Sequence, residues 1–191
     1  MKSLSLILVL LLALVLAITS LFVGVSNVSL ATLFAPDTSA DALRVLLVSR
    51  IPRTLALILA GSSMAIAGLI MQMLVRNRFV EPSTAGTTES AGLGLLAVTL
   101  LAPDTPIFGK MLVAAAFALA GTALFLRILR QVPLRDVLLV PLIGIMLGGV
   151  ISAVTTFFAY RFDLLQSLGA WMTGDFSGVL RGRYELLWIG F

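Results

Sequence analysis

Long apolar runs, separated by short polar or charged stretches, dominate the hydropathy pattern of this chain. Residues 54–75 hold 22 residues without a charge and, at the helical rise, extend roughly 33 Å, enough to cross a bilayer's hydrocarbon core. Further apolar runs lie at residues 4–25, 90–102, 111–126 and 137–160, of which 90–102 is the shortest. The pattern predicts an all-α, polytopic transmembrane helix bundle with five spans.

The segments around these runs are predicted from the same pattern. A secretory signal peptide is the alternative for residues 4–25, but the run exceeds the roughly 7–15 apolar residues of such a peptide, and no clear cleavage site follows. Residues 26–49 are too polar to cross and are expected to be a connecting segment. Residues 164–173 predict a short interfacial helix with Trp171 at headgroup depth. Another apolar helix begins at residue 184.

Composition supports a membrane protein and argues against most enzymes. The chain is 60% hydrophobic and 12% charged, against about 25% charged in typical soluble domains. It has no cysteine and no histidine, which excludes thiol chemistry and His-containing metal sites. The G-x-x-x-x-G-K-[ST] pattern of the ATP-binding P-loop is missing from the sequence. We therefore expect no catalytic site, no cofactor and no resident metal. The net charge of +4 is attributed to arginines beside the spans, and nucleic-acid binding is not predicted.

Small residues recur on one face of the 54–75 helix. Gly61, Ala65, Gly68 and Gln72 are spaced by four, three and four, so they share a face on which another backbone can approach closely. A second stripe in residues 137–160 holds Gly144, Gly148, Ser152 and Thr155. Ordinary helix packing is one interpretation of the first stripe, and the border of a translocation path is the other.

Prolines, glycines and arginines flank the same helix. Arg50-Ile51-Pro52-Arg53 precedes it, and Pro52 suits a first helical turn because its missing N–H has no partner there. Arg76-Asn77-Arg78 ends the apolar run, and Glu81-Pro82 and Gly86 follow. Proline and glycine so near the membrane predict an irregular connection buried in protein.

These residues resemble the FecCD, or BtuC-like, family, which comprises permease subunits of bacterial ABC importers for iron-siderophores, haem and vitamin B12. The resemblance rests on Arg50 to Arg53, on the G-x-x-x-Q of Gly68 to Gln72, and on the turn from Asn77 to Ala91, with Pro82 and Gly86 in register. Trp171, Met172 and Gly174 fit a W-x-x-G element of that family. Members have about ten spans. The resemblance implies that this chain, with five spans and the start of a sixth, is the N-terminal part of a single permease domain.

The resemblance also implies a function and partners. The chain would be a multi-pass permease subunit that moves iron-siderophore complexes across the bacterial inner (plasma) membrane, energised by two cytoplasmic ATPase subunits. A second permease chain, in a homo- or heterodimer, and a periplasmic or lipoprotein substrate-binding protein would complete the importer. Arg50 and Arg53 would receive glutamates of that binding protein, and Arg181 and Arg183 are weaker candidates that could add to the same positive field. The plainer interpretation is that Arg50 and Arg53 snorkel to lipid headgroups.

Other functions stay open on the residues alone. Glu81 and Glu89 could relay protons in an ion-gradient-driven secondary transporter or channel, since intramembrane carboxylates often do. The resemblance instead places Glu81 in a structured turn with Asn77, Pro82 and Gly86. The five predicted spans carry no charge apart from Glu89, which directly precedes the third, and this favours the importer. A structural membrane anchor is the third option.

Charge bias does not choose the orientation of the chain. With the N-terminus inside, six cations fall on the cytoplasmic side and seven on the other, counted as Lys2, Arg76, Arg78, Arg127, Arg130 and Arg135 against Arg44, Arg50, Arg53, Lys110, Arg161, Arg181 and Arg183. The compact cluster over residues 127–135 is typical of a cytoplasmic loop. This cluster and the family resemblance together predict that the N-terminus lies inside.

Overall fold

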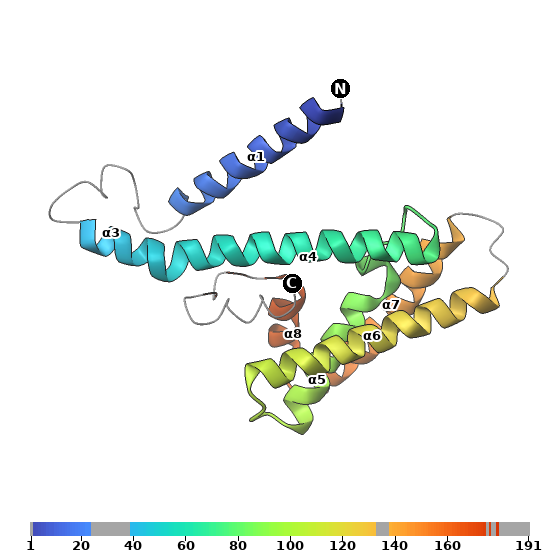
Figure 1. Ribbon diagram of the computed structural model, residues 1–191. Coiled ribbons are helices and arrows are strands. Elements are labelled where there is room, and N and C mark those ends of the chain that lie inside the picture. Colours follow the sequence, from blue (N-terminus) through green and yellow to red (C-terminus); the bar gives the residue numbers. More distant parts are fainter. Residues whose placement is uncertain (1, 24–38, 133–137, 175, 177–178, 180–191) are drawn as a thin grey trace. The chain divides into compact units, whose positions relative to one another are not determined.

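The computed structural model describes residues 2–23, 39–132, 138–174, 176 and 179, and every regular element among them is a helix (Figure 1). In chain order these are α1 (Lys2–Phe22), α3 (Ser39–Val45), the π-helix η1 (Leu46–Arg50), α4 (Ile51–Val75), the 3-10 helix η2 (Ser83–Ala85), α5 (Thr87–Leu101), α6 (Ile107–Gln131), α7 (Leu139–Arg161) and α8 (Leu165–Met172). The predicted all-α class is confirmed. The apolar segment from residue 184 lies outside the described residues.

Four helical stretches are long and apolar enough to cross a membrane. They are Leu4–Phe22, Ala40–Val75, Ile107–Gln131 and Leu139–Arg161. α5 has 15 residues, about 22 Å at the helical rise, and is shorter than a hydrocarbon core of about 30 Å. Five spans therefore stay a prediction, with α5 as the short one.

The helix that holds the Arg50–Arg53 element begins earlier than the sequence predicts. Residues 39–50, expected to belong to a connecting segment, are helical and continue into α4. The N–H of Ile51 bonds to the carbonyl of Leu46, which is the wider spacing of a π turn. An interior proline normally clashes with the carbonyl four residues earlier and removes a hydrogen bond. The π turn directly before Pro52 changes the backbone at that position, so the helix continues through the proline instead of starting at it.

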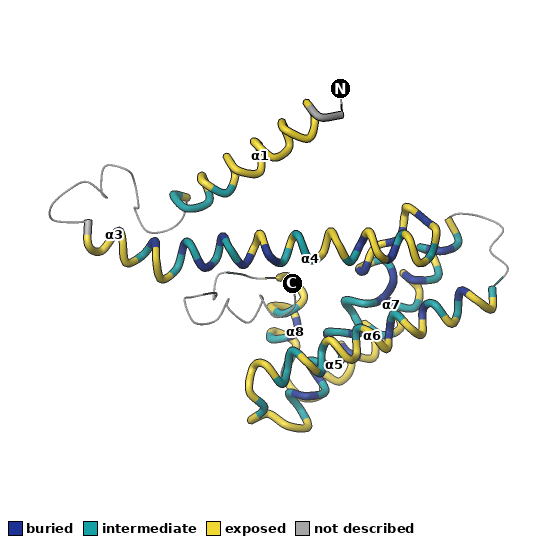
Figure 2. The backbone as a smooth tube through the Cα atoms, viewed as in Figure 1, coloured by how far each residue is buried: buried dark blue, intermediate teal, exposed yellow. Residues whose placement is uncertain are grey.

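The described residues form two compact units, each considered separately: residues 2–23 and 39–63 with Phe176 and Val179, and residues 64–132 with 138–174. In the first unit, α1 is exposed along most of its length (Figure 2). It is held near its end, where the hydroxyl oxygens of Ser20 and Thr54 lie 3.2 Å apart. The exposed face is apolar, as expected of a helix surrounded by lipid.

In the second unit, α5 packs against α6 and α7. Small residues allow the close approach: a Cβ on Gly94 would lie 2.7 Å from the Cβ of Phe117, and one on Gly121 would overlap the hydroxyl of Ser90. Met71, Val80, Ala85, Phe125, Leu129 and Val140 form a buried apolar cluster. The core of this unit thus joins the second half of α4, the turn after it, α6 and α7.

A second, smaller cluster holds α8 in place. Leu168 is buried with Leu96 and Ala159, and Trp171 packs against them. The short helix predicted over residues 164–173 is present as Leu165–Met172. Its position at the membrane interface stays a prediction.

Candidate functional site

α4 ends in a left-handed cap at Arg76. The residue has φ 52°, and the N–H of Asn77 donates to the carbonyl of Gln72 at 3.1 Å. This is the long bond of a Schellman motif, which satisfies a carbonyl that the helix itself leaves without a partner. A non-glycine residue in this conformation costs about 1–2 kcal/mol. The chain therefore turns out of α4 at Arg76. Gln72, four residues earlier, is still on the small-residue face of the helix.

The turn after α4 is held by its own polar groups. Asn77, which is 5% exposed, accepts the N–H of Phe79 at 2.9 Å. The Thr84 hydroxyl accepts the N–H of Glu81 at 2.9 Å and donates to the carbonyl of Glu81 at 3.0 Å. The Ser83 hydroxyl donates to the Glu81 carboxylate at 2.7 Å. Glu81 thus takes part in the hydrogen bonding of the turn through both its backbone and its side chain.

The end of this turn is buried against α7. Ala85 is fully buried, and Gly86 has φ 75°, a left-handed conformation that favours glycine. A Cβ on Gly86 would lie 3.2 Å from the backbone nitrogen of Gly148, and one on Gly144 would overlap the carbonyl oxygen of Thr84. The two glycines of α7 make room for the backbone of the turn. Their stripe was visible in the sequence, but nothing in the sequence indicated that a turn, and not a helix, packs on it.

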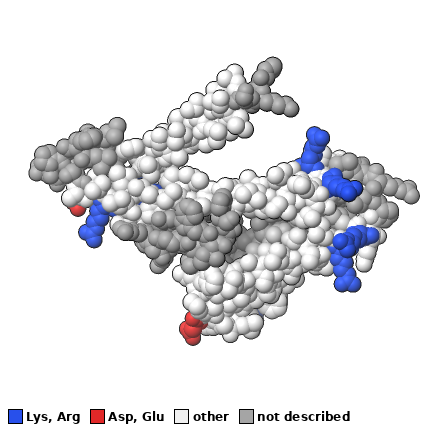
Figure 3. Space-filling model, in the orientation of Figure 1, with Lys and Arg blue, Asp and Glu red and all other residues white. Residues whose placement is uncertain are grey.

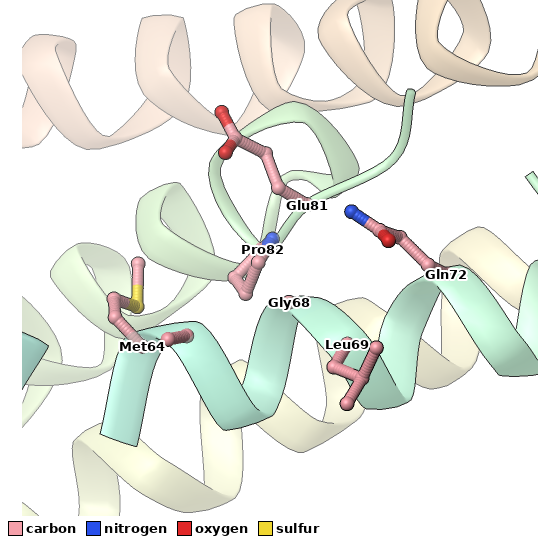
Figure 4. Close-up of a pocket in the computed structure, with 7 residues that line it drawn as sticks. Met64, Gly68, Leu69, Gln72, Glu81 and Pro82 are labelled. Atoms are coloured by element: carbon pink, nitrogen blue, oxygen red, sulfur yellow. The ribbon is translucent and has the colours of Figure 1, made fainter. Parts of the chain in front are cut away.

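A pocket of about 400 Å³ lies between α4 and the turn (Figure 4). Its walls are Met64, Ala65, Gly68, Leu69, Gln72, Glu81 and Pro82. Three residues of the predicted small-residue stripe and two of the predicted turn therefore meet in one place. A Cβ on Gly68 would lie 4.0 Å from the Cδ of Pro82, so the glycine keeps this part of the pocket open.

The polar groups of the pocket have different orientations. Figure 4 shows the Gln72 amide directed towards the loop that carries Glu81 and Pro82, while the Glu81 carboxylate points away from Gln72. Gln72 is half-buried and Glu81 is exposed. Five of the seven lining residues are apolar, and the two polar side chains, Gln72 and Glu81, point in different directions. Such a surface offers few groups that could hold a ligand tightly.

Glu89 lies in a different pocket. It lines a space of about 280 Å³ with Ser83, Ile145, Gly148, Gly149 and Ser152. The Thr88 hydroxyl donates to the Glu89 carboxylate at 3.0 Å. Among the described residues no hydrogen bond joins Glu81 to Glu89. Ser83, which lines this pocket, also donates to the Glu81 carboxylate, so the two carboxylates considered for a proton relay lie near the same serine without a direct bond.

Arg50 and Arg53 have unequal settings in the first unit. Arg50 is 6% exposed, and its guanidinium donates to the carbonyl of Val23. Arg53 is half-buried and donates through Nε to the carbonyl of Phe176 at 3.2 Å. Gly61, the first member of the stripe, is exposed, and a Cβ there would meet open space within 4 Å. Burial of Arg50 is the feature that the sequence did not indicate.

The helices and the buried turn are those of a polytopic helical membrane protein, with an irregular, protein-packed connection after its second long apolar helix. Comparison with known proteins identifies the family of this membrane protein. Residues 10–190 match the FecCD transport family, and the chain belongs to that family. The resemblance drawn from the sequence motifs is confirmed.

Relatives and a solved structure agree with this assignment. The chain is 47% identical over 178 residues to the petrobactin import system permease protein YclN of Bacillus subtilis (strain 168), covering 93% of this chain and 56% of that protein. It is 40% identical over 171 residues to the ferric-anguibactin transport system permease protein FatD of Vibrio anguillarum, covering 90% and 54%.

The fold is similar to that of a solved structure described as a metal-chelate type ABC transporter in an inward-facing conformation, with a TM-score of 0.68 and 24% identity. This likeness covers 92% of this chain and 54% of that one. The chain thus spans about half the length of the relatives and the structure that it matches.

Proposed function

We propose that this chain is part of a permease subunit that carries iron-siderophore complexes across the bacterial inner membrane. The observation that carries the proposal is the family match over residues 10–190 together with 47% identity to a petrobactin permease. The 40% identity to a ferric-anguibactin permease supports the same class of cargo, a chelate of ferric iron. The relatives are named as permeases, so ATP hydrolysis is assigned to separate subunits.

The α4 stripe and the turn are proposed to border the path of the chelate. Ala65, Gly68 and Gln72 line the pocket with Pro82, and the polar side chains of the lining are those of Gln72 and Glu81. A path must bind its cargo weakly enough to release it. ATP binding would close the pair of ATPase subunits, and differential contacts would shift the permease dimer between outward-open and inward-open states.

Arg50 and Arg53 are proposed to face the substrate-binding protein. Guanidinium groups pair bidentately with carboxylates, which suits an acidic partner surface. Arg53, the more exposed of the two, is the better placed for a direct ion pair. Arg50 is buried against a backbone carbonyl, so its contribution would be to hold the helix that presents Arg53.

Uptake of radiolabelled iron tests the proposal. Cells that lack the gene for this chain should fail to accumulate ferric petrobactin or another ferric siderophore, and a plasmid copy should restore accumulation. Uptake should stop when an active-site substitution inactivates the partner ATPase. Uptake that persists without the ATPase but collapses with a protonophore would instead support an ion-gradient-driven transporter.

A further inference from the structure

An apolar groove lies between the ends of α4 and α6 in the second unit. Leu74, Val75, Leu126, Leu129 and Arg130 line a space of about 230 Å³. Leu74 and Val75 are the last two residues of α4, while Leu126 and Leu129 lie in the last turns of α6. Both helices have the length and composition of membrane spans. The groove therefore opens where these helices reach the membrane surface.

Arginines surround the polar end of this groove. Arg76 and Arg78 follow α4, and Arg127 and Arg130 occupy the last turns of α6; all four are exposed. Figure 3 shows cationic side chains gathered at these two helix ends. Among the described residues none of the four forms an ion pair, and the one carboxylate of the neighbouring turn, Glu81, accepts a hydrogen bond from Ser83.

We propose that this groove binds an anionic phospholipid. One acyl chain would lie along Leu74, Val75, Leu126 and Leu129, and the phosphate would lie between Arg76 and Arg130, with Arg78 and Arg127 adding to the positive field. Basic pockets between membrane helices on the cytoplasmic side are suited to anionic headgroups. The observation that selects a lipid over an acidic protein is the apolar groove on the membrane side of the arginines, because an acidic protein surface alone would leave it unfilled.

Native mass spectrometry of the full 191-residue chain in neutral detergent tests this inference. The chain is mixed with equal amounts of phosphatidylglycerol and phosphatidylcholine, and the retained lipids are counted. We expect phosphatidylglycerol to be retained preferentially, and the preference to fall about fivefold for each arginine removed in Arg76→Gln and Arg130→Gln. Arg161→Gln is the matched control, since it removes an exposed arginine at the end of α7, away from the groove.

The apolar half of the site has its own test. Leu74→Ser should weaken lipid retention, whereas Leu119→Ser, at an exposed leucine elsewhere on α6, should not. Excess glycerol 3-phosphate should fail to displace the lipid, because it lacks the acyl chain. Thermal unfolding of each variant separates lost binding from lost folding.

Three results would overturn the inference. One is equal retention of the two lipids by the unaltered chain. Another is unchanged preference in the double variant Arg76→Gln with Arg130→Gln. The third is a double variant that retains lipid as before but no longer binds the purified ATPase subunit. That result would assign the arginines to a protein partner.

Discussion

A Cβ on Gly144 would overlap the carbonyl oxygen of Thr84. Thr84 belongs to the short helix η2, so the backbone of the connection after α4 lies directly on the surface of α7. A Cβ on Gly148, one turn further along α7, would lie 3.4 Å from the Cα of Gly86. Irregular backbone at membrane depth is tolerated where protein buries it, and these two glycines provide that burial.

Gly144→Ala should therefore destabilise the chain. The methyl group can be accommodated only if the turn moves, and overpacking of this kind costs about 1–3 kcal/mol. The measurement is the thermal unfolding midpoint in detergent. Gly149→Ala is the control, because a Cβ at Gly149 has open space within 4 Å; a fall as large in this variant would show that the loss at Gly144 is not due to the turn.

A paired exchange tests the contact between α5 and α6. A Cβ on Gly121 would overlap the Ser90 side chain, so Gly121→Ala should lower the unfolding midpoint. Combining it with Ser90→Gly removes the obstructing atoms and should recover part of the loss. Residues in contact show coupling of about 0.5–3 kcal/mol in such cycles, and strictly additive effects would mean that the helices do not meet there.

Arg50, at the end of η1, and Arg53, in the first turn of α4, are expected to have different roles, structural for Arg50 and docking for Arg53. Arg50→Gln removes the buried guanidinium that donates to the carbonyl of Val23 and should cost about 1.5–3 kcal/mol of stability. Arg53→Glu removes a part-buried bond to the carbonyl of Phe176, so it should cost less stability than Arg50→Gln, and it should weaken binding of the substrate-binding protein, measured by calorimetric titration with the full-length permease. Arg44→Glu, at an exposed arginine of α3, is the control for net charge. Unchanged affinity in Arg53→Glu would remove the docking assignment.

The pocket beside Gly68 gives a prediction about transport. Gly68→Ala adds a methyl group at ordinary contact distance from Pro82 and should preserve both assembly and siderophore uptake. Gly68→Leu extends into the pocket of about 400 Å³ and should slow uptake strongly while the importer still assembles. Uptake at the normal rate in the leucine variant, with assembly verified by co-purification, would place the path elsewhere.

Topology can be measured directly because the chain has no native cysteine. Asp104→Cys lies in the connection between α5 and α6, and Gln131→Cys lies at the end of α6; both positions are exposed. With the N-terminus inside, a membrane-impermeant maleimide should label position 104 in intact cells and position 131 only after permeabilisation. The reverse pattern would invert the orientation and move the groove between α4 and α6 to the outer leaflet.

Hydropathy alone was enough to locate the long helices, because uncharged runs such as residues 54–75 have few other ways to satisfy their backbone in lipid. Hydropathy did not predict the structure of the residues that precede this run. Asp41, Arg44 and Pro52 suggested a break, yet the chain is helical from Ser39 to Val75 apart from the π turn at Leu46–Arg50. Local helix propensity does not reveal that the helix continues through Pro52, because this continuation depends on the backbone geometry of the π turn beside it.

The candidate site was predicted in parts but not as a whole. Spacing placed Ala65, Gly68 and Gln72 on one face, and the prolines and glycines indicated a turn, but their meeting in one pocket depends on how Glu81 and Pro82 fold back towards α4. That path is fixed by packing of the turn on Gly144 and Gly148, far away in the sequence. Burial of Arg50 likewise depends on Val23, 27 residues earlier.

Transport in a purified system tests the central claim most directly. Full-length permease containing this chain would be reconstituted into vesicles with its ATPase subunits and loaded binding protein, and accumulation of the radiolabelled ferric siderophore would be followed. The account predicts accumulation that requires ATP and this chain, and that persists when ion gradients are dissipated. Accumulation without ATP that follows an imposed proton or sodium gradient would contradict it.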